Sequence, residues 1–343
     1  MEKIKVYIED WNNVMTFLMK REELELVSDP RDCDCLVLWQ DVRHYLAELC
    51  MINKEHMHKP LVVVQHGRGA GNDYLPPNSF PMFADKFCCW GTKEYNRLLN
   101  AGFSKDRLVI TGSPLVPFIQ PKKEHNGKNI VFVPIITTHE EPDNINTYWK
   151  LKRIELKKAS EKLMRSYNKL RNTWNAWEVE PTSPTDGSIP YHILNKEWRL
   201  IAKITYTHDK KLYMGDVVQT LQKNKVHLND VINLLSVTDC VVGIEEGTFQ
   251  LLAMAMGIPS VMVEGFSYKD LGGVDYSSVD MIKTKAARRV ELSEIEKIID
   301  EELANPDGLK EEREKILKDE FWDGVSNPID NIINVIKEIT KNG

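Results

Sequence analysis

The 343-residue chain has no apolar run of the roughly 18 residues that a membrane-spanning helix requires. Its longest candidate, which follows Gly247, is interrupted by Gly257 and Pro259. The opening MEKIKVYIED is charged, predicts a strand, and lacks the apolar segment of a secretory signal peptide. These absences predict a soluble, cytoplasmic protein without a transmembrane segment.

An excess of positive charge is also missing. The net charge is −6 and the pI is about 5.9, so no global positive field attracts the chain to nucleic acid or anionic lipid. Hydrophobic residues make up 42% and charged residues 28%, which is ordinary globular composition. The length favours two domains of about 100–200 residues each.

Cysteine pairs with the spacing of zinc ligands are absent. None of the six cysteines forms a CxxC pair, and several stand inside apolar segments such as DCDCLVLW and FCCWG. Free cysteine is one of the most commonly buried residue types. We therefore predict reduced, buried thiols with a packing role at Cys33, Cys35, Cys50, Cys88, Cys89 and Cys240.

The first third of the chain alternates short apolar segments with amphipathic ones. The predicted strands are KIKVYI, ELELV, CLVLW, LVVVQ, KFCCW and RLVITG, and the predicted helices include DVRHYLAELCMINKE and TKEYNRLLNAGF. Continuous apolar strands separated by helices favour a parallel sheet covered on both faces.

After a polar linker over Pro121–Asn129, the same pattern restarts with NIVFVPI, WRLIAKITY, DCVVGI and PSVMV. The sequence thus predicts an α/β protein whose domains span 1–122 and 123–323, with a cleft between the carboxyl ends of their strands. A C-terminal helix over 324–343 can cross back to the first domain.

Residues 144–177 have strong helical periodicity within the second domain. Trp149, Leu156, Leu163 and Trp174 belong to one apolar stripe, and lysines occupy most of the other faces. One interpretation is a helix packed on its stripe with a solvated basic face. The other is a surface that meets an anionic acceptor, either a lipid phosphate or nucleic acid.

The strand LVVVQ ends in a glycine-rich loop, HGRGAG. A dinucleotide fingerprint would open a helix here, but the loop runs into Asn72, Asp73 and two prolines, which argues against that phosphate turn. His66 stands at the carboxyl end of the strand and titrates near neutral pH, so it suits a general base or a phosphate partner. A structural hydrogen bond is the alternative role. Gly67, Arg68 and Gly69 form the candidate cleft loop.

A second candidate is LIAKITYTHDKK. Lys203 follows an apolar strand, and a buried, unpaired lysine would be costly, so it either reaches solvent at the strand end or pairs with an anion. His208 follows closely.

The third candidate is the join between DCVVGI and the next helix, EEGTFQLLAMAMG. Gly247 allows close backbone approach, and the amides near Thr248 suit an anion at a helix N-terminus. Thr248 can cap the helix or bind a phosphate oxygen. One of Glu245 and Glu246 can complement the helix dipole, and the other can face a hydroxyl or a cation. Gly257 is expected to end the helix.

These segments together resemble the GT-B superfamily of nucleotide-sugar enzymes. QHG is similar to the His-Gly loop of CDP-glycerol glycerophosphotransferases and capsule-polysaccharide transferases, and CWGTKEYNRLLNAGFSKDRLVITGSP to the segment that closes their N-terminal domain. WRLIAKITYTHD resembles their strand ending in Lys-x-His-Pro, without the proline and with the histidine displaced. TDCVVGIEEGTFQLLAMAMGIPSV resembles the donor-binding strand-helix-strand, and FWDGVSNPIDNIINVI the closing helix.

Non-hydrolysing UDP-GlcNAc 2-epimerases carry Asp-Ser-Gly-Gly-x-Gln-Glu-Glu at the same place. Gly247 and Gln250 match this motif, and Glu245 is a conservative change. The last glutamate, which binds the donor ribose in many GT-B enzymes, is Leu252 here. The resemblance then implies that another group, such as Glu246, holds the ribose or that the donor is unusual.

The resemblance implies a GT-B fold and a metal-independent glycosyltransferase that needs no cofactor. Its donor would be a nucleotide sugar, and we predict a UDP-linked one. His66 would be the catalytic base, and Lys203 and the amides near Thr248 would neutralise the donor diphosphate. The acceptor could be a glycan, a lipid-linked molecule or nucleic acid, the last as in DNA-modifying glycosyltransferases. The alternatives are a UDP-sugar 2-epimerase and a non-catalytic nucleotide- or glycan-binding protein. The implied donor-binding residues are Lys203, His208, Glu245, Glu246, Gly247, Thr248 and Gln250.

Overall fold

The structure is a computed structural model that describes ten parts of the chain. They are residues 3–9, 18–41, 44–67, 83–120, 128–133, 198–203, 218–221, 228–243, 247–263 and 284–342. The predicted helical segment over 144–177 lies outside them.

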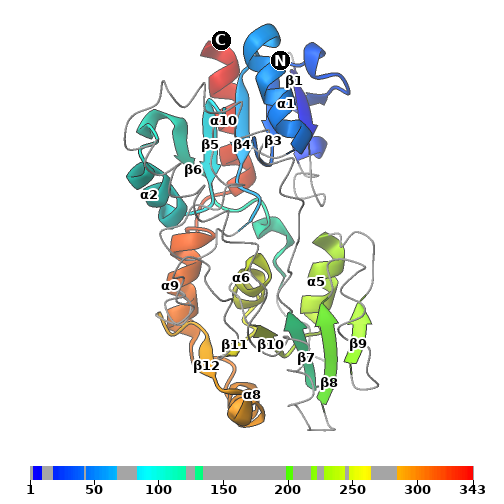
Figure 1. Cartoon of the computed structure of the whole chain (residues 1–343), viewed down its shortest axis with the longest axis vertical. Helices are drawn as coiled ribbons and strands as arrows, with labels where there is room; N and C mark the ends of the chain where they lie inside the picture. Colours follow the sequence, from blue (N-terminus) through cyan, green and yellow to red (C-terminus); the bar gives the residue numbers. More distant parts are fainter. Residues whose placement is uncertain are drawn as a thin grey trace. The chain divides into compact units, whose positions relative to one another are not determined.

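The described residues form two compact units. The first holds those up to Pro117 and those from Lys318 onward, and the second holds those from Phe118 to Leu317. Each unit contains one parallel sheet, and each is described by itself (Figure 1). No helix in the described parts of the chain is both long enough and apolar enough to cross a membrane.

The sheet of the first unit has six strands in the order β2-β1-β3-β4-β5-β6, and every pairing is parallel. β2 lies on the outer side of β1, whereas β4, β5 and β6 follow one another on the outer side of β3. The winding direction therefore switches between the neighbouring strands β1 and β3. All six predicted strands are confirmed. Their bounds are β1 Ile4–Glu9, β2 Leu24–Leu26, β3 Cys35–Leu38, β4 Leu61–Val64, β5 Lys86–Cys89 and β6 Leu108–Ile110.

The helices α1 (His44–Ile52), α2 (Thr92–Ala101) and α10 (Pro328–Asn342) belong to the first unit. The predicted first helix is shorter than expected, because a wider π-type turn over Asn53–Met57 follows α1. α10 packs against β4 and β5 (Figure 1). Its buried residues recur with helical spacing, which joins the C-terminal helix to the core of the first sheet. They are Pro328, Ile329, Ile332, Ile333, Val335 and Ile336.

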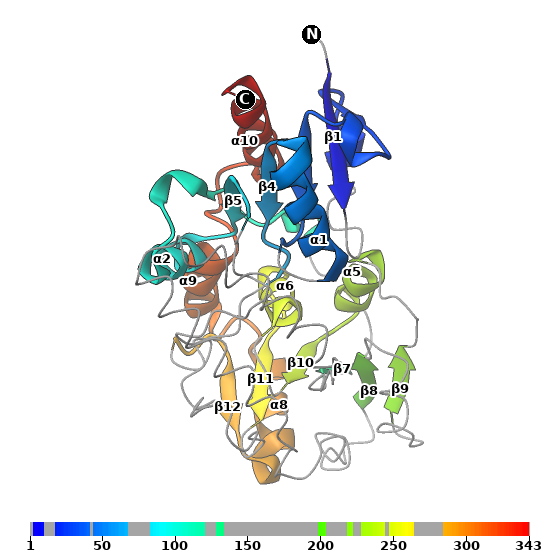
Figure 2. The same ribbon diagram turned by 45° about the horizontal axis from the view of Figure 1, so that its top comes forward.

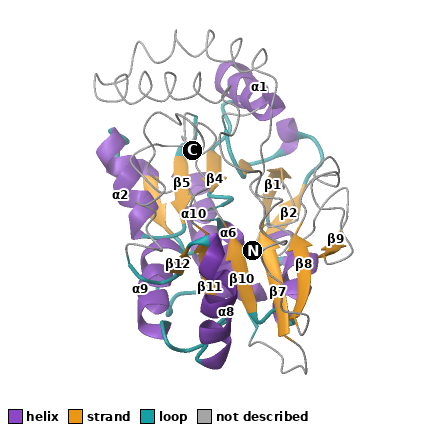
Figure 3. Ribbon diagram, turned by 60° about the horizontal axis from the view of Figure 1, so that its bottom comes forward, coloured by secondary structure: helices purple, strands orange, loops and turns teal. Residues whose placement is uncertain are grey.

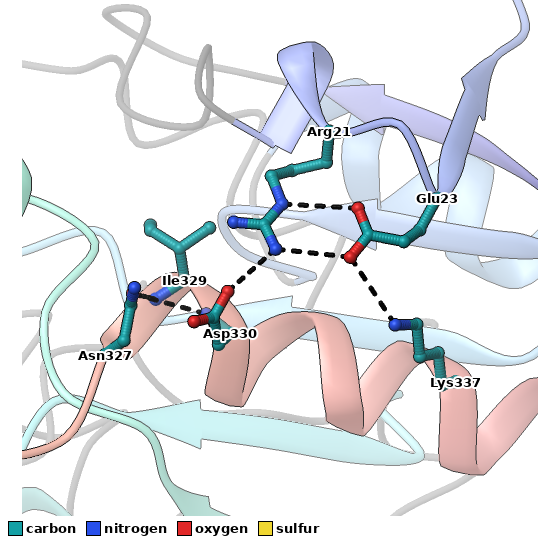
Figure 4. A network of polar contacts seen from close by, with 6 residues as sticks. All are labelled: Arg21, Glu23, Asn327, Ile329, Asp330 and Lys337. Atoms are coloured by element: carbon teal, nitrogen blue, oxygen red, sulfur yellow. Dashed lines mark hydrogen bonds and ion pairs between the residues drawn. The ribbon is translucent and has the colours of Figure 1, made fainter.

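A network of ion pairs ties α10 to the segment before β2 (Figure 4). The Arg21 guanidinium contacts a carboxylate oxygen of Glu23 at 3.2 Å and one of Asp330 at 2.8 Å. Lys337 lies 3.6 Å from Glu23, so one carboxylate is shared by two cations. Arg21 holds the pKa of Glu23 at about 2, well below its ordinary 4.5, mainly through its hydrogen bonds.

Replacing Glu23 by glutamine should destabilise the first unit near neutral pH, and this difference should disappear in acid. Because the pKa of Glu23 is depressed in the folded state, its stabilisation is complete above about pH 4.5 and is lost as the pH falls towards 2. Urea unfolding at several pH values measures this. Glu25→Gln is the control, since Glu25 is exposed and has no ion pair among the described residues. A Glu23→Gln effect of equal size at every pH would contradict the prediction.

The sheet of the second unit also has six parallel strands, in the order β12-β11-β10-β7-β8-β9. Counted along the chain from β7, this is the doubly wound order 3-2-1-4-5-6, whose winding direction switches between β7 and β10. The four strands predicted here are confirmed. The bounds are β7 Lys128–Val133, β8 Trp198–Lys203, β9 Val218–Leu221, β10 Cys240–Gly243, β11 Ser260–Val263 and β12 Arg288–Val290.

The predicted linker is two residues too long at its end, because β7 begins at Lys128. Asn129 is polar but buried, and its side chain is satisfied by the turn before β10. Its Nδ2 donates to the Val237 carbonyl at 2.6 Å, and its backbone N–H donates to an Asp239 carboxylate oxygen at 2.7 Å. A polar residue can therefore start a buried strand here.

The helices of the second unit include α5 (Leu228–Ser236), α6 (Thr248–Ala255) and α8 (Ile295–Ala304). α6 connects β10 to β11 (Figure 2) and packs against β11. α8 packs against β10, β11 and β12 (Figure 3). α9 (Lys310–Glu320) contains the boundary between the two units. The prediction that the chain is helical after about Leu292 is confirmed.

All six cysteines are buried and none forms a disulfide, as the sequence predicts. Burial raises the pKa of the Cys88 thiol to about 12 and raises that of Cys35 and Cys89 further above the usual range. Thiols in such surroundings stay protonated and unreactive near neutral pH.

Candidate functional site

His66 lies just beyond the carboxyl end of β4, as predicted. Its half-buried ring meets the indole of Trp39 edge-on, with centroids 4.8 Å apart and planes at 78°. Trp39 directly follows β3, so the contact joins the carboxyl ends of two neighbouring strands. Edge-to-face contacts of this kind fix ring orientation, and the imidazole is thereby held at the sheet edge.

Gln65 holds the loop that carries His66. Its Oε1 accepts from the Trp90 backbone N–H at 2.8 Å, and its Nε2 donates to the Gly67 carbonyl at 2.9 Å. Gln65 is 4% exposed, so these bonds are made in a dry environment, where each is strong and costly to lose. The side chain ties the end of β5 to the residues on both sides of His66. Sequence reasoning missed this role, although QHG contains the residue.

Gln40 and Asp41 also follow β3, one of the two strands between which the winding switches. Asp41 is buried and accepts from the backbone N–H groups of Phe83 and Ala84. Gln40 is 2% exposed, and within the described parts of the chain neither polar atom of its amide has a hydrogen-bond partner. Such groups are rare in native structures, and a bound water, an ion or a catalytic role can account for them. The polar pair that ends CLVLWQD was the available signal in the sequence.

In the second unit, Gly247, Thr248 and Gln250 form the start of α6. Gly247 occupies the N-cap position in an extended conformation, and Thr248 is the first helical residue. Of the two roles expected for Thr248, capping is therefore wrong, since the cap position falls one residue earlier, and binding of a phosphate oxygen stays a prediction. The backbone N–H groups of a first helical turn point along the axis, and the helix dipole adds about half a positive charge there.

Gln250 folds back over this first turn. A Cβ added to Gly247 would lie 3.1 Å from the Gln250 Oε1, and no other described atom would come within 4 Å. Gln250 itself is 1% exposed. Two of the residues that match the epimerase motif are thus in contact at the start of the helix.

The other end of α6 is tightly closed. Gly257 has φ +79°, its N–H bonds the Met254 carbonyl at 3.0 Å, and the N–H of Ile258 bonds the Ala253 carbonyl at 2.9 Å. This is the Schellman arrangement, and it confirms that Gly257 ends the helix. The buried Arg313 donates to the Gly257 carbonyl at 3.3 Å, and its burial lowers the pKa of the guanidinium. α6 is therefore anchored at its far end.

Leu251 and Leu252 are 0% and 2% exposed and belong to the core. α6 is buried on nearly all sides between Phe249 and Met254. The position that the sequence resemblance compares with a ribose-binding glutamate therefore holds an apolar, buried side chain here.

Lys203 is the last residue of β8 and lies at the carboxyl edge of the second sheet, as predicted. Ala202 pairs with Phe132 on β7, and Val133 in turn pairs with Gly243 on β10. Continuing this register places Lys203 level with Gly243, two strands or about 10 Å away. The remaining predicted site residues lie outside the described parts of the chain: Arg68, Gly69, His208, Glu245 and Glu246.

The chain contains two Gly-Thr helix starts, and they differ in what covers them. At α2, a Cβ on Gly91 would lie 2.2 Å from the Asp319 carbonyl oxygen, and the Thr92 hydroxyl donates to that oxygen at 3.4 Å. Backbone carbonyl groups thus close the start of α2. Among the described residues, no backbone atom lies this close to Gly247.

Comparison with known proteins finds similarity in structure only. No family model and no curated protein matches the sequence. A putative UDP-N-acetylglucosamine 2-epimerase from Listeria monocytogenes is 13% identical, with a TM-score of 0.55, over 100% of this chain and 98% of that one. The wall teichoic acid polymerase TagF is 11% identical, with a TM-score of 0.56, over 99% and 89%. HepE from Anabaena, in complex with UDP and glucose, is 8% identical, with a TM-score of 0.51, over 99% and 100%.

These proteins have the GT-B fold, and the chain shares it along its full length. The predicted fold class, two Rossmann-like parallel-sheet domains, is confirmed.

Proposed function

We propose that this chain of GT-B fold is a glycosyltransferase, which moves a sugar from a nucleotide-activated donor to an acceptor hydroxyl. The donor would bind the second unit and the acceptor the first. The solved structures of similar fold include one with UDP and glucose bound, which supports a UDP-linked donor.

The observation that carries the proposal is the position of α6. This helix follows β10, one of the two strands between which the winding of the second sheet switches. In open α/β sheets, ligands bind outside the carboxyl ends of the strands at such a switch point. A helix that starts there, with Gly247 at its cap, suits a diphosphate.

His66 supports the acceptor role of the first unit. It lies at the carboxyl edge beside the switch between β1 and β3, and Trp39 and Gln65 fix its ring and its loop. Gln40 is buried at the same edge, just after β3, the strand next to β4. Its amide can both donate a hydrogen bond to a hydroxyl-bearing ligand and accept one from it.

In the proposed reaction, the His66 imidazole takes the proton of the acceptor hydroxyl while the oxygen bonds to the anomeric carbon. The bond between that carbon and the donor phosphate oxygen breaks, and its electron pair leaves with the diphosphate. The positive end of α6 and the Lys203 ammonium stabilise the developing charge. This chemistry requires the two carboxyl edges to close on the substrates during turnover.

A 2-epimerase is the second candidate, favoured by the contact between Gly247 and Gln250, the two residues that match the epimerase motif. The buried Leu252 stands at the position compared with a ribose-binding carboxylate of both enzyme types, so it does not separate the two candidates. Incubating UDP-N-acetylglucosamine with the protein alone and following the C2 proton by NMR separates the two. A C2 epimer formed without any acceptor would replace the transferase proposal.

UDP should stabilise the protein against heat, because a ligand that binds only the native state raises its stability by mass action. At a concentration of one hundred times its Kd, the gain is about 2.7 kcal/mol. Thermal-shift measurements with UDP, GDP, CDP and ADP test this, with uridine as the control that lacks the diphosphate. No stabilisation by any diphosphate would contradict the proposal. Stabilisation without donor consumption would identify a non-catalytic binding protein.

A further inference from the structure

The first unit has a groove at the amino ends of its strands, the edge opposite to His66. Its volume is about 1650 Å³. Residues at the starts of β1, β2, β3 and β4 line it, together with the last turns of α10. It lies within one unit and does not overlap the proposed donor and acceptor sites.

Basic side chains outnumber acidic ones along this groove by seven to four, although the whole chain has a net charge of −6. The acidic residues are Glu22, Glu23, Glu25 and Asp34. The basic residues are Lys3, Lys5, Lys20, Arg21, Lys59, Lys337 and Lys341.

Partners within the protein already neutralise part of this set. Glu23 is held between Arg21 and Lys337, as Figure 4 shows. Asp34 keeps its charge, because the hydrogen bond that it accepts from the backbone N–H of Lys5, at 2.8 Å, has a neutral donor. The other five lysines form no ion pair with any described residue, and four of them are exposed. The carboxylates of Glu22, Glu25 and Asp34 likewise form no ion pair with any described residue, so the unpaired charge in the groove is positive by five to three.

We propose that this groove binds an extended polyanion, a linear chain that carries several phosphate groups. The five unpaired lysines stand on β1, the segment before β2, the segment before β4 and α10, so they are spread along the groove. A row of separated charges suits successive phosphates and gains affinity by releasing their counterions.

The lining favours a soluble chain over a membrane surface. Proteins that lie on a membrane insert apolar side chains beside their basic residues. The apolar lining residues Ile4 and Met57 are instead partly buried and pack against the core of the sheet. The network of Arg21, Glu23 and Lys337 fixes the wall formed by α10, so the groove is held open without a ligand.

Fluorescence anisotropy with labelled linear inorganic polyphosphate tests the proposal on the full chain. The groove variant combines Lys3→Glu, Lys5→Glu, Lys20→Glu and Lys341→Glu. The control variant has the same net charge and changes four exposed lysines elsewhere: Lys105, Lys297, Lys315 and Lys318, each to glutamate. The groove variant should bind roughly tenfold or more weakly than the control, with a shallower salt dependence.

Three results would overturn the proposal: no binding by the wild type, an equal loss in both variants, or binding to phosphatidylglycerol vesicles but not to polyphosphate. Stabilisation by UDP should be the same in the wild type and the groove variant. A failure of polyphosphate binding with UDP binding intact would therefore refute the groove alone and leave the proposed function standing.

Discussion

Replacing His66 by alanine is expected to lower turnover by about 10²–10⁴-fold, the usual contribution of a general base. Stabilisation by UDP should be unchanged, because the donor is proposed to bind the second unit. Release of nucleoside diphosphate from the donor, in the presence of a panel of hydroxyl acceptors, measures turnover. The acid limb of the wild-type pH profile of kcat/KM should also disappear in the variant.

His56→Ala is the matched control, since His56 is an exposed histidine of the same unit. It should retain wild-type turnover. Full activity in His66→Ala would remove this residue from the mechanism. Equal losses of turnover and UDP binding would show that the substitution damages the fold instead.

Gly91→Ala and Gly247→Ala should differ sharply in stability, although both change the N-cap glycine of a Gly-Thr helix start. The two residues have nearly the same extended conformation, with φ −150° and −144°. Alanine is a poorer N-cap residue than glycine, and this contribution to the loss of stability should be the same at both positions. A Cβ at Gly91 would overlap the Asp319 carbonyl, which is backbone and cannot move aside cheaply. We expect Gly91→Ala to cost about 3 kcal/mol through overpacking. Urea unfolding followed by tryptophan fluorescence measures it.

Gly247→Ala should cost at most about 1 kcal/mol, since its Cβ meets only the end of the Gln250 side chain. It should instead weaken UDP binding about tenfold, or about 1.4 kcal/mol, because the methyl group stands where the diphosphate approaches the helix. Similar stability losses in the two variants would contradict the steric argument. Unchanged UDP affinity in Gly247→Ala would argue against a diphosphate at α6.

Local sequence pattern was sufficient for ten of the twelve described strands and for the C-terminal end of α6, whereas β9 and β12 were not predicted. The runs LVVVQ and DCVVGI are apolar and β-branched, and such runs are typical of buried parallel strands. The helix EEGTFQLLAMAMG is bounded by two glycines, and the structure places its cap and its Schellman end at these residues. Each of these features depends on residues within one or two turns of one another.

The site contacts depend on residues far apart in the sequence, and pattern does not reveal them. The Gln65 amide contacts Trp90, which is 25 residues away, and Trp39 reaches His66 only because β3 and β4 are neighbours in the sheet. Asn129 starts a buried strand because the turn before β10, more than 100 residues later, satisfies its amide. Pairing and register must be known before such contacts can be predicted.

The burial of every cysteine makes the chain a ready background for site-specific labelling. Because none of the six thiols is exposed, a cysteine introduced on the surface would be the only thiol that reacts with a maleimide dye. One such cysteine in each unit would form a donor–acceptor pair for energy transfer without removal of any native residue. The closure that the proposed reaction requires can thus be followed in solution as a change of transfer efficiency when the donor substrate is added.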